Sequence, residues 1–167
     1  SQTEVGSSDN TFTYKLNDGT RDENYTIIQT EGTLTVTAKS ATDMNVDTPS
    51  DHQYDGAEYK WEPTVKDGKK ALVKGTDYTV TYNKSDFTNV TGTIKVTITG
   101  TGNYEGEVTR EYQITKRTVT LKSADLSKPY DGTELVNGET ALAKEDGWVT
   151  GEGATYTFTG SQTEVGR

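Results

Sequence analysis

The residues with the most obvious chemical potential are few. His52 is the single histidine, and Ser50 and Asp51 precede it directly. These three residue types suggest nucleophilic catalysis, but neighbours in sequence do not have the geometry of a catalytic triad, and nothing indicates an oxyanion hole. We therefore expect His52 to be a solvated loop residue in the turn-rich segment 47–53, DTPSDHQ, and we expect no enzymatic activity.

Three aromatic side chains could stack against the apolar faces of sugars. Tyr59 and Trp61 share one phase of an expected strand that ends at Pro63, and this favours packing in a core. Trp148 follows Gly147 in a loop-like segment, so it is the better candidate for exposure. The alternative to structural roles is therefore a glycan contact made by Trp148, Trp61 and Tyr59.

The acidic segment 17–24, NDGTRDEN, is the best candidate for a metal site, because calcium is bound by oxygen ligands. It lacks the alternating ligands and the closing glutamate of an EF-hand loop, so we interpret it as a plain turn. A covalent Lys–Asn crosslink would need a buried lysine, whereas Lys15, Lys60 and Lys95 fall on the outward phase of their expected strands. We expect no catalytic residue, no metal and no cofactor.

The composition indicates a β-rich protein with a small core. Hydrophobic residues make up 29% of the chain, while threonine and ten tyrosines are prominent. Branched and aromatic side chains pack well on a pleated surface, so they favour strands. The net charge of −9 argues against binding to nucleic acid, whose phosphates require a basic face, and against anionic membranes. No cysteine is present, which excludes disulfides and thiol chemistry.

Alternation of apolar and polar residues predicts the strands that must position these side chains. In 92–100, GTIKVTITG, three branched residues face one way, and the threonines and the lysine face the other. The same pattern is present in six further segments: 11–17, 32–38, 77–83, 111–115, 117–123 and 154–160. Only 139–147, ETALAKEDG, has the composition of a short helix. We expect a mainly β fold with one short helix at most.

The chain repeats itself on two scales. SQTEVG occupies residues 1–6 and again 161–166, so the long period is 160 residues. Two shorter motifs recur within it: Tyr54-Asp55-Gly56 as Tyr130-Asp131-Gly132, and Asn24-Tyr25 as Asn103-Tyr104. Because these motifs lie at the edges of expected turns, we interpret their residues as structural anchors that define the repeats.

The recurrences predict two alternating modules. One is complete at 38–115, whereas the other is split, with 1–37 as its C-terminal half and 116–167 as the N-terminal half of the next copy. On this interpretation the chain is about one period of a longer tandem array. A half-module exposes strand edges and an apolar face. We expect halves of neighbouring copies to complete each other head to tail, which generates filaments or rings; the alternative is that the halves stay frayed.

Two segments of the split module carry a family resemblance. Residues 118–138, TVTLKSADLSKPYDGTELVNG, resemble the start of the MBG/YDG-type repeats of bacterial cell-surface proteins, and 24–37, NYTIIQTEGTLTVT, resemble their end. The middle unit is similar to a related surface repeat of Gram-positive gut anaerobes, through Tyr54-Asp55-Gly56, 65–83 and 89–106. The resemblance implies β-grasp-like or immunoglobulin-like domains in adhesin stalks, some of them associated with mucin binding, and it carries no catalytic residues.

These observations lead to a structural role as the main expectation. We expect an elongated series of small β-sandwich or β-grasp modules that forms the stalk of an extracellular protein, attached to a bacterial cell wall or secreted. Its partners would be neighbouring copies of the same repeat. The alternative is a module that binds mucin or another host glycan and gains avidity by repetition. We expect no contact of this segment with nucleic acid or with a membrane.

Overall fold

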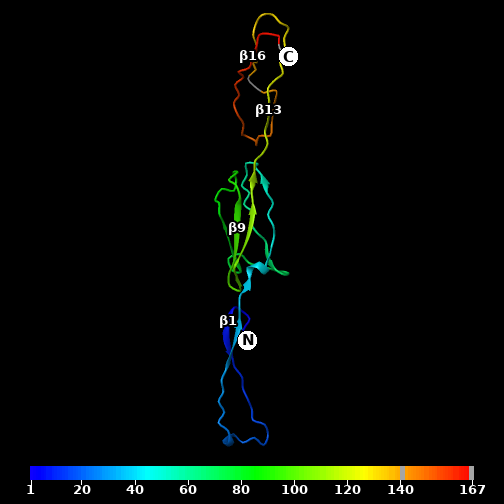
Figure 1. Ribbon diagram of the computed structural model, residues 1–167. Helices are drawn as coiled ribbons and strands as arrows, with labels where there is room; N and C mark the ends of the chain where they lie inside the picture. Colours follow the sequence, from blue (N-terminus) through cyan, green and yellow to red (C-terminus); the bar gives the residue numbers. More distant parts are fainter. Residues whose placement is uncertain (140–141, 166–167) are drawn as a thin grey trace. The chain divides into compact units, whose positions relative to one another are not determined.

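The computed structural model describes residues 1–139 and 142–165 and confirms a mainly β protein built from short strands (Figure 1). The chain divides into two compact units. The first consists of Ser1–Pro49, Trp61–Ser85 and Ile94–Tyr112, and the second of Ser50–Lys60, Asp86–Thr93 and Gln113–Arg167. The module boundaries expected from the repeats stay a prediction. Among the described residues, no helix has the length and apolar character needed to cross a membrane.

The main sheet of the first unit is antiparallel throughout. Its order is β11-β9-β8, with β8 at Tyr78–Tyr82, β9 at Ile94–Gly100 and β11 at Glu107–Tyr112. The three branched residues of β9, Ile94, Val96 and Ile98, are fully buried, whereas Lys95 is exposed. This alternation confirms the strands predicted for 77–83 and 92–100 and the outward phase of Lys95.

Shorter strands complete the core of the first unit. β4 (Asn45–Val46), β6 (Val65–Asp67) and β7 (Lys70–Ala71) form an antiparallel sheet, and β3 (Lys39–Ser40) pairs in parallel with β10 (Tyr104–Glu105). The 3-10 helix η2 (Ala41–Asp43) follows β3. The buried hydrophobic residues of this unit are Ala41, Met44, Val46, Val65, Leu72, Tyr78, Ile94, Val96, Ile98, Tyr104 and Tyr112.

The Asp67 carboxylate accepts two hydrogen bonds that link strands around this core. Lys39 Nζ donates to Asp67 Oδ1 at 2.6 Å, and the Tyr104 hydroxyl donates to Asp67 Oδ2 at 3.1 Å. The hydrogen bond with Asp67 raises the pKa of Lys39, and the same bond lowers the pKa of Asp67. The Lys39–Asp67 pair therefore links β3 to β6, and the Tyr104 hydroxyl links β10 to β6.

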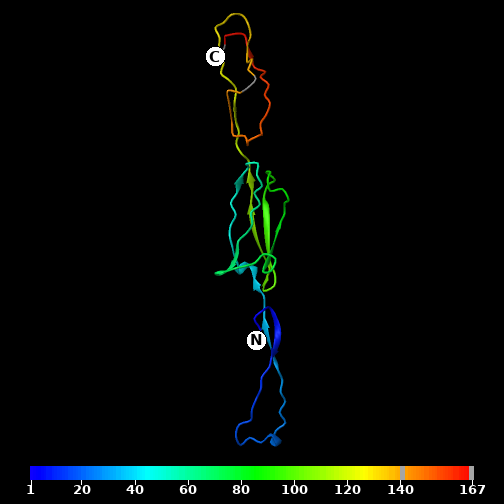
Figure 2. The same cartoon turned by 180° about the vertical axis from the view of Figure 1, so that it is seen from behind.

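The hairpin at the start of the first unit is paired near its base and opens into a loop. β1 (Gly6–Asn10) pairs antiparallel with β2 (Gly32–Val36), which confirms the strand predicted for 32–38. Beyond β1 and β2 the two arms separate into a wide loop that holds the 3-10 helix η1 (Asp22–Asn24), as Figures 1 and 2 show. The prediction of a strand over 11–17 is wrong for this chain, because no strand pairs with these residues.

The described part of the second unit contains three strand pairs. β5 (His52–Gln53) pairs in parallel with β12 (Ile114–Thr115), while β13 (Thr120–Lys122) pairs with β15 (Lys144–Asp146) and β14 (Leu135–Val136) with β16 (Ser161–Gln162), both antiparallel. These pairs confirm strands within 111–115 and 117–123. The strand predicted over 154–160 is wrong for this chain, because these residues are unpaired.

The short helix expected over 139–147 is wrong where the structure describes this segment, which contains a strand and no helix. Residues 144–146 form β15, and its pairing with β13 outweighs a weak local helix propensity. Residues 140–141 of the expected helix lie outside the described residues.

Candidate functional site

His52 is not the solvated loop residue that the sequence predicts. It lies in β5, where its ring stacks on Tyr59 with centroids 4.3 Å apart and planes inclined by 10°. Its Nε2 is 3.1 Å from Asp55 Oδ2. Asp51 has a separate role, because its Oδ1 accepts the Gln113 N–H at 2.8 Å. The pairing of β5 with β12 thus brings His52 into the fold, a long-range contact that no local pattern indicates.

The three aromatic candidates for a glycan contact each have their own surroundings. One face of Tyr59 is covered by the His52 ring. Trp61 is half-buried, and its backbone N–H donates to the Tyr112 hydroxyl oxygen at 3.3 Å. Trp148 is half-buried rather than exposed as predicted, and its indole nitrogen is shielded from solvent. The glycan contact stays a prediction.

The acidic segment 17–24 forms the turn that was predicted. The Thr20 N–H bonds the Asn17 carbonyl at 3.0 Å, and Gly19 supplies a φ of +85°. Across residues 1–139 and 142–165, no group of three or more His, Asp or Glu side chains is placed to hold a metal ion.

The two Tyr-Asp-Gly motifs form the same turn. Asp55 Oδ1 accepts the Ala57 N–H at 2.9 Å, and Asp131 Oδ1 accepts the Thr133 N–H at 2.9 Å. The glycine of each motif has a positive φ, +82° in the first and +74° in the second, which glycine adopts without the steric cost of a side chain. The recurrence in sequence is therefore a recurrence in backbone geometry.

The aspartates of these turns are held in the charged form. Lys128 Nζ lies 2.9 Å from Asp131 Oδ1, and its hydrogen bond is the main reason that the pKa of Asp131 lies far below its usual range. The Ala57 N–H is the main cause of the lowered pKa of Asp55, and His52 contributes in the same direction.

The Asn-Tyr motifs and the hexapeptides also repeat their local geometry. The Tyr25 N–H bonds the Asp22 carbonyl at 3.0 Å, and the Tyr104 N–H bonds the Thr101 carbonyl at 3.2 Å. In both copies of SQTEVG, the glutamine side chain donates to the carbonyl of the glutamate two residues on, at 2.7 Å.

The two copies of the hexapeptide have different partners, because Ser161 and Gln162 of the second copy pair with β14, whereas the first copy is held by Asn103. In the first unit, the Asn103 side chain accepts the Val5 N–H at 2.9 Å and donates to the Glu4 carboxylate. The corresponding valine of the second copy, Val165, is 85% exposed, whereas Val5 is 40% exposed. Asn103 therefore does more than anchor a turn, because it also holds the segment that leads into β1.

A further equivalence was not predicted. Residues 73–76 and 149–152 form the same turn, in which the fourth N–H bonds the first carbonyl at 3.1 and 2.9 Å, and the glycines have φ of +86° and +90°. Their shared Val-x-Gly pattern, 76 residues apart like the Tyr-Asp-Gly motifs, is the signal that could have found it.

Within the second unit, the first Tyr-Asp-Gly turn contacts the 149–152 turn. The Tyr54 hydroxyl donates to the Glu152 carboxylate, which raises the pKa of Tyr54. A Cβ placed on Gly56 would lie 2.9 Å from Val149 Cγ1, so the glycine permits this close approach. A pocket of about 220 Å³ beside the contact is lined by Tyr54, Trp148, Val149 and Glu152, among others.

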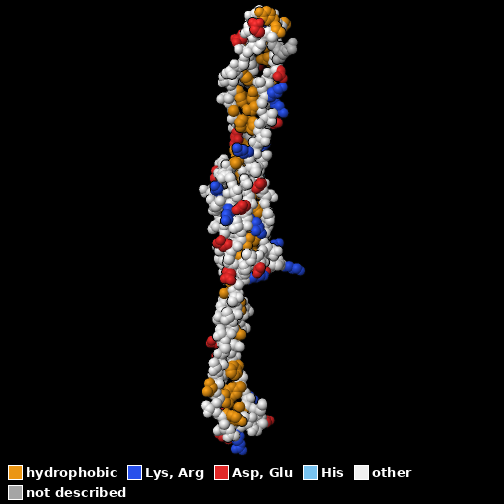
Figure 3. Space-filling view, viewed as in Figure 1, with side chains coloured by type: hydrophobic (Ala, Val, Ile, Leu, Met, Phe, Trp, Pro, Cys, Tyr) orange, Lys and Arg blue, Asp and Glu red, His pale blue; other side chains and the backbone are white. Residues whose placement is uncertain are grey.

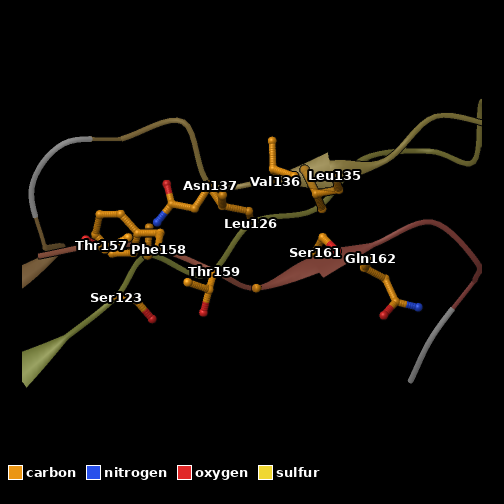
Figure 4. A pocket seen from close by; sticks show the side chains of 12 residues that line it. Ser123, Leu126, Leu135, Val136, Asn137, Thr157, Phe158, Thr159, Ser161 and Gln162 are labelled. Carbon is orange, nitrogen blue, oxygen red and sulfur yellow. The ribbon is translucent and has the colours of Figure 1, made fainter.

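The strongest candidate for a binding surface is an open groove of about 380 Å³ in the second unit (Figure 4). Its apolar lining comes from Leu126, Leu135, Val136 and Phe158. Residues 157–159 run along it with a backbone that pairs with no strand. A groove with an apolar lining and an unpaired backbone edge is suited to receive an added strand.

The loop between β1 and β2 in the first unit has the chemistry of such a strand. Figure 3 shows apolar side chains gathered on this loop, and those that are strongly exposed are Phe12, Tyr14, Tyr25, Ile27 and Ile28. Phe12 and Tyr14 alternate with Thr11, Thr13 and Lys15, as Ile94, Val96 and Ile98 alternate with polar residues in β9.

The strand pairings give the correspondence between these segments. Ser8 lies opposite Leu34, and Ile94 lies opposite Tyr112. Leu34 and Tyr112 hold the same place in the two module ends, GTLTVT and REYQIT. Ser8 therefore corresponds to Ile94, and four residues further on Phe12 corresponds to Ile98.

In comparisons with known proteins, no family model, no curated protein and no solved structure matches this chain. The resemblance to MBG/YDG-type repeats therefore depends on the sequence motifs alone.

Proposed function

We propose that this chain is a structural segment of a fibrous bacterial surface protein, in which residues 7–17 of one copy add a strand to the groove of the preceding copy. One observation carries the proposal. In β8 and β9 the alternating pattern is paired, with Val80 opposite Ile98, whereas its counterparts 154–160 and 11–17 are unpaired and carry apolar side chains.

The repeated hexapeptide supplies the connection between the halves. Ser161 and Gln162 form β16 beside the groove, and in the other copy of the hexapeptide the same residue types lead directly into β1. A segment equivalent to 7–17 that follows residues 161–166 would therefore begin at the groove. Such a segment would belong to the next repeat, either on the same longer chain or on a second chain.

The internal correspondences also predict the register of the added strand. The spacing of 76 residues relates Val80 to Tyr156, and Ile98 corresponds to Phe12. Tyr156 of one copy would thus lie opposite Phe12 of the next, and the outward residues Thr157 and Thr11 would form the adjacent pair. Backbone hydrogen bonds would supply affinity, and the alternate apolar side chains would fix the register.

The function that follows is mechanical. Antiparallel ladders completed across each join would give a continuous stalk, and a net charge of −9 per period would keep neighbouring stalks apart. The placement on a bacterial surface is supported by the Tyr-Asp-Gly and Asn-Tyr motifs. A glycan-binding role has less support, because Trp148 is half-buried.

Light scattering across a concentration series tests the proposal. The molar mass should rise above 18.2 kDa with concentration. Phe12→Asp should hold it near the single-chain value, because a carboxylate would lose hydration against the apolar side chains that line part of the groove. Thr13→Asp, on the outward phase of the same segment, is the matched control and should still assemble.

The added strand could come from the same longer chain or from a second chain, and a covalent tandem distinguishes these two sources. In this tandem a second copy continues at Ser7 after Gly166 of the first. If the join is completed along one chain, the tandem should be more stable than the single chain, and Phe12→Asp in its second copy should remove the gain. The proposal would be overturned if the single chain stayed at 18.2 kDa at every concentration and the tandem also showed no gain in stability.

A further inference from the structure

The contact between Tyr54 and the 149–152 turn provides a template for a second contact. Tyr54 and Val149 are both half-buried there, and Gly56 lies against Val149. Each partner has a counterpart 76 residues away with the same local geometry: the Tyr130-Asp131-Gly132 turn and the 73–76 turn. The chain thus contains two copies of each docking element.

Within the described residues, the corresponding side chains of the second pair of docking elements are exposed. Tyr130 is 63% exposed and Val73 is 58% exposed. A Cβ placed on Gly132 would meet no atom within 4 Å, in contrast to the 2.9 Å approach at Gly56. Two surfaces that have the shape of an established contact are therefore both open.

The order of the elements along the sequence identifies the partner. The first Tyr-Asp-Gly turn, at 54–56, lies in the expected module 38–115 and contacts the 149–152 turn, which lies in the module that follows it. By the same rule, the turn at 130–132 should contact the Val-x-Gly turn of the module that follows its own. In a head-to-tail array that turn is 73–76 of the following copy.

We infer that Tyr130 and Gly132 of one copy dock on Val73 and its turn in the next copy. This inference depends on the head-to-tail order of the proposed function but uses a surface distinct from the groove. Val73 stands in place of Val149, so the apolar part of the contact is retained. Thr76 stands in place of Glu152, so the Tyr130 hydroxyl would meet a neutral side chain, and the contact should be the weaker of the two.

A double-mutant cycle in the covalent tandem tests the inference. Tyr130→Ala is placed in the first copy and Val73→Ala in the second, singly and together, and urea unfolding is measured. Because both residues are exposed in the single chain, neither substitution should impair folding. The two changes should be coupled, so that the double variant's unfolding equilibrium constant departs from the additive value by a factor on the order of 3 to 10.

The matched control exchanges the copies. Val73→Ala in the first copy and Tyr130→Ala in the second should be additive, since these residues have no common partner. Coupling that is absent in both arrangements, or equal in both, would overturn the docking contact. Phe12→Ala in the second copy tests the added strand separately. It alters the contact with the groove but does not change the 73–76 turn.

Discussion

The same alternating pattern has two outcomes in this molecule. In β9 it is paired on both sides, by β8 and β11, and Ile98 is fully buried. In residues 11–17 no strand pairs with it, and Phe12, the residue that corresponds to Ile98, is 50% exposed. Alternation therefore encodes a strand only where a second backbone supplies hydrogen bonds and an apolar face.

Truncation of the two corresponding residues should give the largest difference. Ile98→Ala removes a fully buried side chain and should lower the free energy of unfolding by about 2–5 kcal/mol. Phe12→Ala in the single chain, at a concentration where it is monomeric, should change it by less than about 0.5 kcal/mol. Urea unfolding measures both. Equal effects would contradict the comparison, because they would mean that Phe12 is already packed in a core.

A glycine substitution tests whether the β13–β15 pair of the second unit is stably formed. Gly147 has a φ of +106°, and a Cβ there would lie 2.3 Å from the Thr118 carbonyl oxygen. Gly147→Ala should therefore destabilise the β13–β15 pair by about 1–3 kcal/mol, seen as faster amide hydrogen exchange in these strands. Gly153→Ala, whose Cβ would meet nothing within 4 Å, is the control and should leave exchange unchanged. Rapid exchange in the unmodified chain would instead show that the pair is frayed.

Acid should weaken both Tyr-Asp-Gly turns. The pKa values of Asp55 and Asp131 are lowered in the fold, so their stabilisation is present above the unfolded pKa of about 3.9 and is lost as the pH falls through the folded values. Thermal unfolding should give a melting temperature that falls below about pH 4. Asp131→Asn keeps an acceptor for the Thr133 N–H and should reduce this pH dependence. An Asp131 carboxyl that titrates in its usual range by NMR would contradict the assignment.

The smallest effect should come from the Lys39–Asp67 pair. Its side chains are 46% and 27% exposed, so Lys39→Met should lower the melting temperature only slightly, and less at high salt. Lys66→Met, at an exposed position of β6, is the control and should have no salt-dependent effect. A cost that high salt leaves unchanged would mean that the Lys39 stem contributes by packing rather than by charge.

Local patterns predicted the main sheet of the first unit and several of the shorter strands. The strands in 32–38, 77–83, 92–100, 111–115 and 117–123 followed from alternation, and the turns followed from their glycine, asparagine and aspartate residues. The recurring motifs likewise predicted equivalent turns at Tyr54 and Tyr130. Local signals succeeded here because each depends on one segment and its neighbours.

Local sequence patterns did not predict which distant segments pair with each other. The parallel bridge of β5 with β12 places His52 in the fold, and the pairing of β13 with β15 makes a strand of residues 144–146. Both depend on segments far away in sequence. The docking of Tyr54 on the 149–152 turn was missed for the same reason, although the Val-x-Gly repeat offered a clue.

In the proposed assembly, residues 7–17 of one copy pair with 154–160 of another in a defined register. The chain has no cysteine, so Thr157→Cys in one chain and Thr11→Cys in a second allow a clean test by oxidation of an equimolar mixture. Directly opposed residues fall within disulfide distance. The mixed disulfide should form faster with Thr11→Cys than with Thr13→Cys. Equal rates, or no mixed disulfide at concentrations where the mass has risen, would contradict this pairing.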